Sequence, residues 1–258
     1  MNERLDFTFT KFSRLLNCLL DAGYSFQKLE DFIINPSYRT VILRHDVDRA
    51  PFHSLRTANL EQSLGIKGTY YFRIVRQSNN TSVISEIAAL GHEIGYHYED
   101  LAMKGGDQEN AIAAFKSNLE YFSTFYPVKT ICMHGSPASK WDNSDLWKKY
   151  NYKDFGILAE PYFDIDFMNL LYLTDTGRSW NGYRTSVRDK VDQERFRVLK
   201  EKLVNTSDII NAVRNNELPD RIMLTVHPQR WSDNYSDWLA ELVKQSLKNT
   251  VKRIMFVR

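Results

Sequence analysis

Short apolar segments alternate with helix-forming segments through the first half of this chain, and this alternation restricts the possible folds most. Runs rich in β-branched and aromatic residues are typical of strands, whereas apolar residues spaced by three or four positions are typical of helices. Strands are expected at 41–45, 68–75, 92–97 and 128–133. Helices are expected at 51–65, 81–90 and 107–125. Because strands separated by helices normally pair in parallel, the pattern predicts an α/β fold with a parallel sheet.

The two ends of the chain show a less regular pattern. No repeat, low-complexity segment or linker interrupts the sequence, so we expect a single domain over 1–258, with 1–40 as an N-terminal helical extension. The extension carries a helix at 8–22. Beyond residue 138 we expect short strands at 156–159 and 170–174, a helix at 207–215, a strand at 221–226, a helix at 234–248 and an edge strand at 253–257.

Composition excludes several classes of protein. The net charge of +2 comes from scattered lysines and arginines, which does not indicate a nucleic-acid partner. No apolar run approaches the ~18 residues of a transmembrane segment, and the N-terminus does not resemble a signal peptide. Two cysteines, Cys18 and Cys132, fit a reducing compartment. The expected location is the cytoplasm.

Two carboxylates follow the first predicted strand. Side chains alternate along a strand, so Asp46 and Asp48 should point to the same side. Such a pair repels, shares a proton or shares a cation; the alternative is a polar turn closed by an Asx-type hydrogen bond. Arg44 and His45 precede the pair and are expected to orient Asp46.

Four of the six histidines, His45, His97, His134 and His227, stand near predicted strand ends. Strand carboxyl ends meet on one face of a parallel α/β fold, where active sites form. A single histidine is more often structural, but four beside a carboxylate pair indicate a site. Aspartate and histidine ligands beside a free carboxylate suit a hydrolytic divalent metal ion. Since no Gly-x-Ser-x-Gly elbow and no glycine-rich phosphate loop is present, a metal hydrolase is the remaining interpretation.

These motifs resemble those of the polysaccharide deacetylase (NodB-homology) superfamily over about residues 40–230. The resemblance implies a distorted (β/α) barrel of about seven parallel strands. The segment Asp46-Val47-Asp48 is similar to a variant of the family's first motif, which implies Asp46 as general base and Asp48 as metal ligand. The Gly-His-Glu-Ile-Gly-Tyr-His run ending at His97 is similar to the start of the second motif, which implies His97 as a ligand and His92 as structural.

The chain departs from the family where a second histidine is expected, because Leu101 stands there. His134 or Glu99 is the candidate replacement, and His134 is favoured because it keeps the imidazole and follows a neighbouring strand, near the family's third-motif loop. The strand ending at His227 resembles the last motif, which implies that His227 is the general acid. The metal is expected to be zinc, with nickel, cobalt or manganese as alternatives.

Further polar and aromatic residues are candidates for binding a sugar, since tryptophan stacks on a pyranose ring and arginine holds a carboxylate or phosphate. The alternative is that these residues belong to loops held by an Arg–Asp pair. A second Asp-x-Asp, Asp164 and Asp166, is interpreted as structural. The sugar-binding candidates are Asp175, Arg178, Trp180, Arg230 and Trp231.

The combined motifs resemble a group of deacetylase-like proteins from bacterial surface-polysaccharide (O-antigen) gene clusters. We therefore expect a metal-dependent carbohydrate de-N-acetylase: Asp46 activates water and His227 protonates the departing amine. The absence of a signal peptide favours a nucleotide- or lipid-linked sugar as substrate. Two alternatives remain, a hydrolase of another carbon–nitrogen bond, such as a cyclic amide or formamide, and a non-catalytic carbohydrate-binding descendant.

Overall fold

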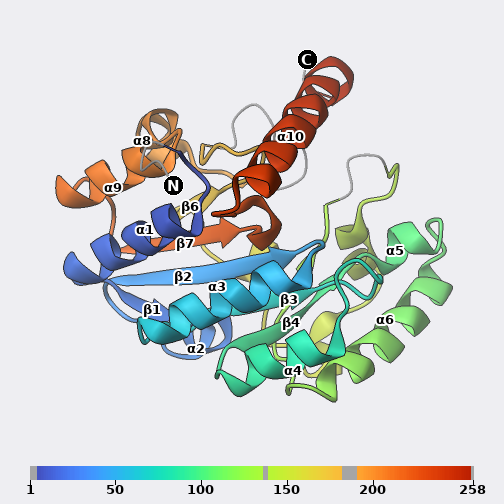
Figure 1. Cartoon of the computed structure of the whole chain (residues 1–258). Coiled ribbons are helices and arrows are strands. Elements are labelled where there is room, and N and C mark those ends of the chain that lie inside the picture. The colour runs from blue at the N-terminus through green and yellow to red at the C-terminus, as the bar shows by residue number, and fades with distance from the viewer. Residues whose placement is uncertain (1–4, 136–138, 182–190, 257–258) are drawn as a thin grey trace.

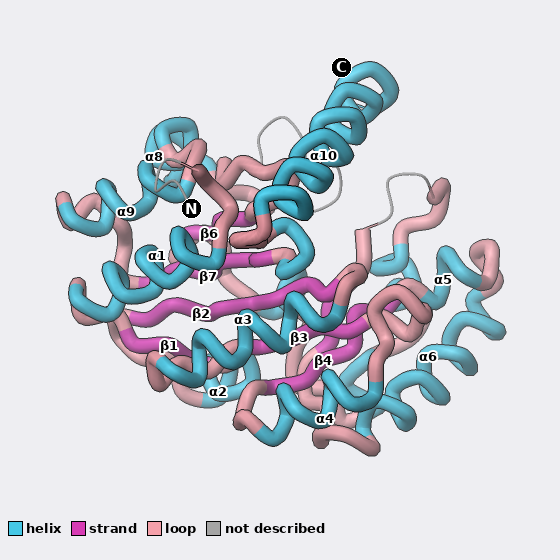
Figure 2. The backbone as a smooth tube through the Cα atoms, in the orientation of Figure 1, coloured by secondary structure: helices cyan, strands magenta, loops and turns pink. Residues whose placement is uncertain are grey.

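Parallel strands form one curled sheet in the computed structural model, which describes residues 5–135, 139–181 and 191–256. The sheet curls into a half-barrel flanked by helices (Figures 1 and 2), so the predicted distorted (β/α) barrel is confirmed. In the described residues the strand order is β5-β4-β3-β2-β7-β6, with β1 also pairing with β2. The strands are β1 (Ser25–Gln27), β2 (Thr40–Val47), β3 (Thr69–Phe72), β4 (Glu93–Tyr98), β5 (Ile131–Met133), β6 (Leu171–Thr174) and β7 (Arg221–Val226).

Helices connect consecutive strands and cover the sheet. The long ones are α1 (Phe9–Asp21), α3 (Pro51–Ser63), α4 (Thr81–Ala89), α6 (Gln108–Ser123), α9 (Thr206–Arg214) and α10 (Tyr235–Phe256). Shorter ones are α2 (Leu29–Ile34), α5 (Asp100–Met103), α7 (Pro161–Asp164) and α8 (Arg197–Lys202). Four 3₁₀ helices complete the described part, η1 (Asn143–Lys148), η2 (Tyr152–Phe155), η3 (Glu194–Phe196) and η4 (Pro228–Arg230).

The central strand β2 decides which side chains enter the half-barrel. Every residue of β2 is buried. Val41 and Leu43 pack in the cluster that contains the apolar faces of α1 and α9, on the helix-covered side of the sheet. Ile42 packs in a separate cluster with side chains of β3, β5, β6 and β7. Since side chains alternate along a strand, Arg44 and Asp46 share the inner side with Ile42, and His45 shares the outer side with Val41.

Several predicted elements differ from the structure. The N-terminal extension is not only helical, because Ser25–Gln27 pairs with Thr40–Ile42 and extends the sheet. The strand predicted at 156–159 is wrong, since only an isolated bridge between Thr130 and Ala159 forms there. The edge strand predicted at 253–257 is also wrong: α10 continues to Phe256, and Val257 lies outside the described residues. No glycine or proline interrupts the chain over α10, so nothing in the sequence ends this helix earlier.

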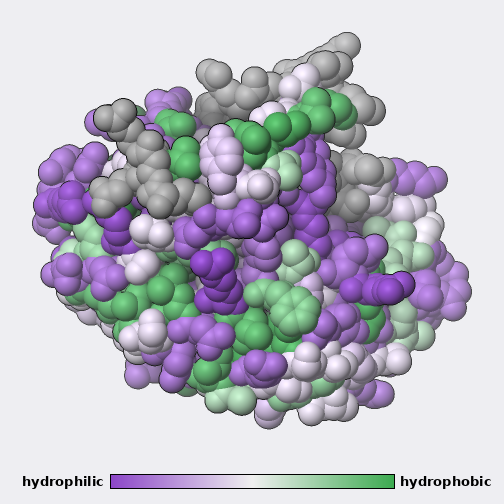
Figure 3. All heavy atoms as spheres, in the orientation of Figure 1, coloured by the Kyte–Doolittle hydropathy of each residue, from purple (hydrophilic) through white to green (hydrophobic). Residues whose placement is uncertain are grey.

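The last helix extends away from the sheet and carries apolar side chains on its exposed face (Figure 3). These exposed residues recur every fourth position: Tyr235, Leu239, Val243, Leu247 and Val251. In the part of the chain that the structure describes, no helix is long and apolar enough to cross a membrane.

Candidate metal centre and active site

The first functional pair lies at the carboxyl end of β2. Arg44 and Asp46 are two residues apart on the inner side of the strand, and both are almost fully buried. The Arg44 guanidinium donates from Nε to Asp46 Oδ1 at 2.8 Å and from Nη2 to Oδ2 at 2.6 Å. Burial raises the pKa of the Asp46 carboxyl, but the charges of Arg44 and His97 outweigh it and lower the pKa to about 2. Asp46 is therefore an ionised, oriented carboxylate at neutral pH.

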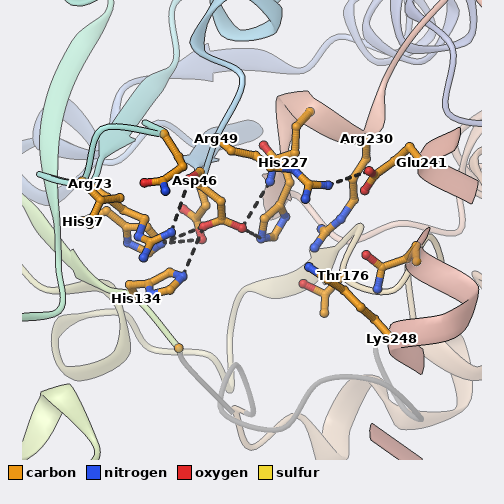
Figure 4. A pocket seen from close by; sticks show the side chains of 16 residues that line it. Asp46, Arg49, Arg73, His97, His134, Thr176, His227, Arg230, Glu241 and Lys248 are labelled. Atoms are coloured by element: carbon orange, nitrogen blue, oxygen red, sulfur yellow. Dashed lines mark hydrogen bonds and ion pairs between the residues drawn. The ribbon is translucent and has the colours of Figure 1, made fainter. Parts of the chain in front are cut away.

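Asp48 follows the end of β2 and faces His97 and His134, which come from β4 and the end of β5 and lie beside each other in Figure 4. Its Oδ1 atom lies 3.8 Å from Nε2 of His97, in β4, and 3.5 Å from Nε2 of His134, just after β5. The three ligand atoms offered by Asp48, His97 and His134 lie within 4.8 Å of one another. Parallel pairing of β2, β3, β4 and β5 brings these distant segments together.

A glycine allows this part of the sheet to pack closely. Gly95 precedes His97 by two residues and so faces the same side of β4. A Cβ atom at Gly95 would lie 2.3 Å from the ring of Tyr71 and 2.9 Å from the carbonyl oxygen of Thr130. Any larger residue would displace Tyr71, whose ring lies 6.4 Å from that of His97. Close packing beside the site thus requires the glycine two residues before His97.

The Nδ1 atoms of both histidines are held from behind. His97 Nδ1 lies 2.9 Å from the carbonyl oxygen of Cys132, and His134 Nδ1 lies 3.0 Å from Glu99 Oε2. Each acceptor favours the tautomer with a proton on Nδ1, which leaves the Nε2 lone pair directed toward Asp48. Burial outweighs the opposing charge of Asp46 and lowers the pKa of His97 to about 4, so its imidazole is neutral at neutral pH. Both histidines therefore direct Nε2 toward Asp48, and His97 is in the neutral form that binds metal.

Glu99 is occupied with other partners. It accepts from Nε and Nη2 of Arg73 at 2.8 and 2.7 Å, in addition to its contact with His134. Burial raises the pKa of the Glu99 carboxyl, but the hydrogen bonds from His134 and Arg73 outweigh it and lower the pKa to about 2. This geometry favours His134 as the third ligand and makes Glu99 the residue that orients it.

The residues present fit a divalent metal ion. Asp48 Oδ1 is buried and lacks a hydrogen-bond partner among the described residues, which is costly unless a cation lies beside it. The other oxygen, Oδ2, accepts from Gln229 Nε2 at 3.2 Å. Burial raises the pKa of the Asp48 carboxyl, and the nearby histidines outweigh it and hold the pKa below its usual value. One carboxylate oxygen and two imidazole nitrogens match the ligands that zinc and similar ions prefer.

A second possible group of ligands, Asp46, His97 and Cys132, also lies within the described residues. It is less suited to a metal because both Asp46 oxygens already accept from Arg44. Cys132 is fully buried and its thiol lies 3.6 Å from the carbonyl oxygen of Met133. The Asp48 group is therefore the better candidate metal centre.

His227 completes the site from the end of β7. Its Nε2 atom lies 4.0 Å from Asp48 Oδ2, and its Nδ1 lies 2.6 Å from Asp175 Oδ1. Asp175 also accepts from the His227 backbone N–H at 2.9 Å, from Arg230 Nη1 at 2.5 Å and from Trp231 Nε1 at 2.8 Å. Every one of these donors orients or neutralises the buried Asp175 carboxylate, and through it fixes the ring of His227.

Most of the residues predicted to bind sugar do not face the pocket. Asp175 and Trp180 are fully buried, and Trp231 is only 1% exposed. Trp180 donates from Nε1 to Thr206 Oγ1 at 2.9 Å. Neither tryptophan can stack on a sugar in this structure, and Asp175 instead holds His227. The predicted sugar-binding role of Trp180 and Trp231 is therefore corrected, because both rings pack in the hydrophobic core.

Arg178 is also placed differently from the prediction. Its guanidinium packs over the rings of Phe7 and Trp238 and donates to the carbonyl oxygen of Arg230 at 3.1 Å. It stabilises the loop and does not line the pocket. Of the predicted sugar-binding residues, Arg230 alone is among the pocket-lining residues that the structure describes.

The other two histidines of the prediction, His45 and His92, are structural. His45 lies on the outer side of β2, with Nε2 2.7 Å from Glu61 Oε1, so the prediction that it orients Asp46 is wrong. The alternation of side chains in a strand separates it from the two aspartates. His92 accepts from the Gly68 backbone N–H at 3.0 Å and lies 3.2 Å from the carbonyl oxygen of Ala58, within the buried core. His92 thus has structural contacts, as the prediction implied, but these contacts are in the core and not beside the candidate metal centre.

These groups open into a cavity of about 580 Å³. The sequence interpretation missed several of its lining residues. Arg73 follows β3, so the same strand-end argument would have found it. The residues of α10 carried no sequence signal, because nothing in the pattern places this helix at the mouth of the half-barrel. The missed residues include Arg49, Arg73, Gln229, Glu241, Gln245 and Lys248.

No family model matches the chain, and no curated protein matches it. Solved structures resemble it at low identity. A CE4 family pseudoenzyme from Bacillus anthracis aligns at 12% identity over 82% of this chain and 64% of that one, with a TM-score of 0.42. A polysaccharide deacetylase from Bacillus cereus aligns at 13% identity over 82% and 89% of the two chains, with a TM-score of 0.43.

The CE4 domain of a multidomain xylanase from the hindgut metagenome of Trinervitermes trinervoides aligns at 14% identity over 83% and 85% of the two chains, with a TM-score of 0.39. The present chain spans less than two thirds of the length of the Bacillus anthracis structure. Similarities this low do not assign an activity, so function is argued from the geometry of the site.

Proposed function

We propose that this protein is a metal-dependent hydrolase that removes the acyl group from an N-acylated sugar, as a member of the polysaccharide deacetylase (NodB-homology) superfamily. The observation that carries the proposal is the convergence on Asp48 of the Nε2 atoms of His97 and His134. Asp48 Oδ1, the atom they face, has no hydrogen-bond partner among the described residues. An oriented carboxylate, Asp46, and a third histidine, His227, lie within about 4 Å of this group, as a general base and a general acid for amide hydrolysis would.

Asp48, His97 and His134 would hold the ion, with zinc as the first expectation and nickel, cobalt or manganese as alternatives. When bound, such an ion acts as a Lewis acid that polarises a carbonyl and lowers the pKa of water. The chain contributes the orientation of each ligand through Cys132 and Glu99.

Asp46 is proposed as the general base. Its Oδ2 atom lies 3.9 Å from Nε2 of His97, so the carboxylate stands directly beside the ligand group without belonging to it. Arg44 keeps it ionised and fixed in position. As the oxygen of water adds to the acyl carbonyl carbon, Asp46 takes the proton that the water loses.

His227 is proposed as the general acid. Its Nε2 atom lies 4.0 Å from Oδ2 of Asp48, and Asp175 holds its Nδ1. When the carbon–nitrogen bond breaks, the departing amine nitrogen takes the proton from Nε2. A ligand group alone would serve a binding protein. The additional carboxylate and histidine, each oriented by a buried partner, therefore favour catalysis over simple carbohydrate binding.

The resemblance in motifs further leads us to propose a role in bacterial surface-polysaccharide (O-antigen) biosynthesis, with a nucleotide- or lipid-linked sugar as substrate. A cytoplasmic location is proposed with it. The sequence contains only two cysteines, Cys18 and Cys132, and so low a count is usual in a reducing compartment.

Release of acyl groups from a panel of N-acylated sugars, before and after metal removal with dipicolinate, tests the proposal. We expect acetate release from at least one N-acetylated sugar, loss of release after metal removal and recovery with added zinc or cobalt. Sugar binding without any release would support the non-catalytic alternative. Release from a cyclic amide or formamide, but from no sugar, would support the other one.

A further inference from the structure

The pocket continues past His227 to a second end, away from the candidate metal centre. Figure 4 shows His97 and His134 on one side and Arg230, Glu241 and Lys248 on the other, with His227 between them. The second end is built from three separate segments: the turn after β2, η4 after β7, and α10. Since each segment contributes a cation, this end is defined by the fold and not by one basic stretch of sequence.

Positive charge exceeds negative charge at this end. Arg49, Arg230 and Lys248 supply three cations, against the one carboxylate of Glu241, which leaves a net charge of +2 among these lining residues. Glu241 pairs with Arg49 at 2.5 Å. Arg230 reaches the buried Asp175, which His227 and Trp231 already share, and its Nε has no partner among the described residues.

The positive charge of Lys248 is the least compensated of the three. No hydrogen bond or ion pair holds its ammonium group among the described residues, although it lines the pocket. Partial burial and the positive charges of Arg49 and Lys244 lower the pKa of Lys248. Holding like charges together in this way is unfavourable unless an anion joins them.

We propose that this end of the pocket binds a phosphoryl group of the substrate while the N-acyl group lies at the candidate metal centre. The inference rests on the proposed function and narrows its substrate class from N-acylated sugars in general to sugars that carry a phosphate or diphosphate. Arginine and lysine are the side chains that bind phosphate most effectively, through charge-assisted hydrogen bonds. A neutral oligosaccharide would leave Lys248 without an anion and the excess of positive charge at this end uncompensated. A nucleotide-linked and a lipid-linked sugar would both supply the same phosphoryl group.

Isothermal titration of the purified full-length protein with pyrophosphate tests this site without requiring hydrolysis. We expect pyrophosphate to bind and the Lys248→Gln variant to weaken it about tenfold, the loss of one charge-assisted contact. Lys244→Gln is the matched control, because Lys244 precedes Lys248 by one helical turn and does not line this pocket. It should weaken binding clearly less than Lys248→Gln does, since Lys244 is exposed and outside the lining of this pocket.

Titrations with uridine diphosphate and farnesyl diphosphate distinguish the two sources of the phosphoryl group. Tighter binding of uridine diphosphate than of pyrophosphate would identify a nucleotide-linked substrate, and tighter binding of farnesyl diphosphate a lipid-linked one. Equal binding of all three compounds would support the phosphoryl site alone. Absence of pyrophosphate binding, or equal affinity in the wild type and Lys248→Gln, would overturn the phosphate site even if the protein hydrolyses N-acylated sugars. Binding that depends on Lys248, without acyl release from any sugar, would instead overturn the proposed function and leave the phosphate site standing.

Discussion

The Nε2 atom of His134 lies 3.5 Å from Oδ1 of Asp48, although Asp48 follows β2 and His134 follows β5, with β3 and β4 between these two strands in the sheet. In the proposed site, this pairing would take the place of the histidine that the resemblance to deacetylases leads us to expect where Leu101 stands. Leu101 is 2% exposed and packs in the cluster beneath β4 and α6, so it contributes no ligand. The third ligand is thus offered by a different strand, with its own supporting carboxylate in Glu99.

Substitutions of His134 and Glu99 should have unequal effects on metal affinity. His134→Ala removes a proposed ligand, whereas Glu99→Gln removes only the carboxylate that orients it. We expect His134→Ala to abolish tight binding and Glu99→Gln to weaken it about tenfold, within the range for residues that support a ligand. Competition with a chromophoric zinc chelator measures both affinities. A larger loss from Glu99→Gln than from His134→Ala would mean that Glu99 is the ligand.

Asp175→Asn should separate catalysis from metal binding. Asp175 contacts His227 Nδ1 and none of the proposed ligands, so we expect kcat to fall about 100-fold while KM and metal content stay near wild type. Steady-state kinetics with metal analysis by mass spectrometry checks this. A purely structural role would appear differently, as a lower melting temperature and reduced metal content with an unchanged kcat per bound metal.

Buried Glu93 should make stability depend on pH. It accepts from Thr69 Oγ1 at 2.7 Å and from the Glu30 backbone N–H at 3.1 Å. Burial, and then the charge of Glu30, raise its pKa from 4.5 to about 7. Because the folded state holds this proton more tightly than the unfolded state, the stabilisation is present below pH 4.5 and is lost as the pH rises through about 7.

Glu93→Gln stays neutral throughout this range. Its free energy of unfolding relative to wild type should therefore rise between pH 4.5 and 8, by up to about 3 kcal/mol. Urea denaturation at several pH values measures the difference, and Glu86→Gln, at an exposed position on α4, serves as the control. A difference that does not change with pH would show that Glu93 is ionised in the folded protein across the whole range.

The strand ends were the part of the site that sequence could predict. Asp46, Asp48, His97, His134 and His227 all line one pocket, because parallel strands bring their carboxyl ends to the same edge. Period-two alternation, applied strictly, would also have excluded His45, which stands between Arg44 and Asp46 and so faces the opposite side. The strand-end argument and the alternation argument together account for most of the candidate metal centre.

Tertiary packing decided what the sequence could not predict. Trp180 and Trp231 looked like sugar-stacking residues in a polar loop, yet both are buried and lie 6.0 Å apart, ring to ring. A tryptophan stabilises a core by the same apolar surface that would bind a sugar, so local sequence does not distinguish the two roles. Lys248 shows the converse: an ordinary lysine on a helix gains a possible function only because α10 reaches the pocket.

Metal content after purification without chelators tests the central claim most directly. Inductively coupled plasma mass spectrometry should find about one divalent ion per chain in the wild type, as the ligand group implies. Asp48→Ala should contain none, whereas Asp46→Asn should keep the ion and lose acyl release about 10²–10⁴-fold, as expected for a general base. Loss of metal in Asp46→Asn but not in Asp48→Ala would reverse the two roles. A wild-type protein that neither contains nor binds zinc, nickel, cobalt or manganese would contradict the account.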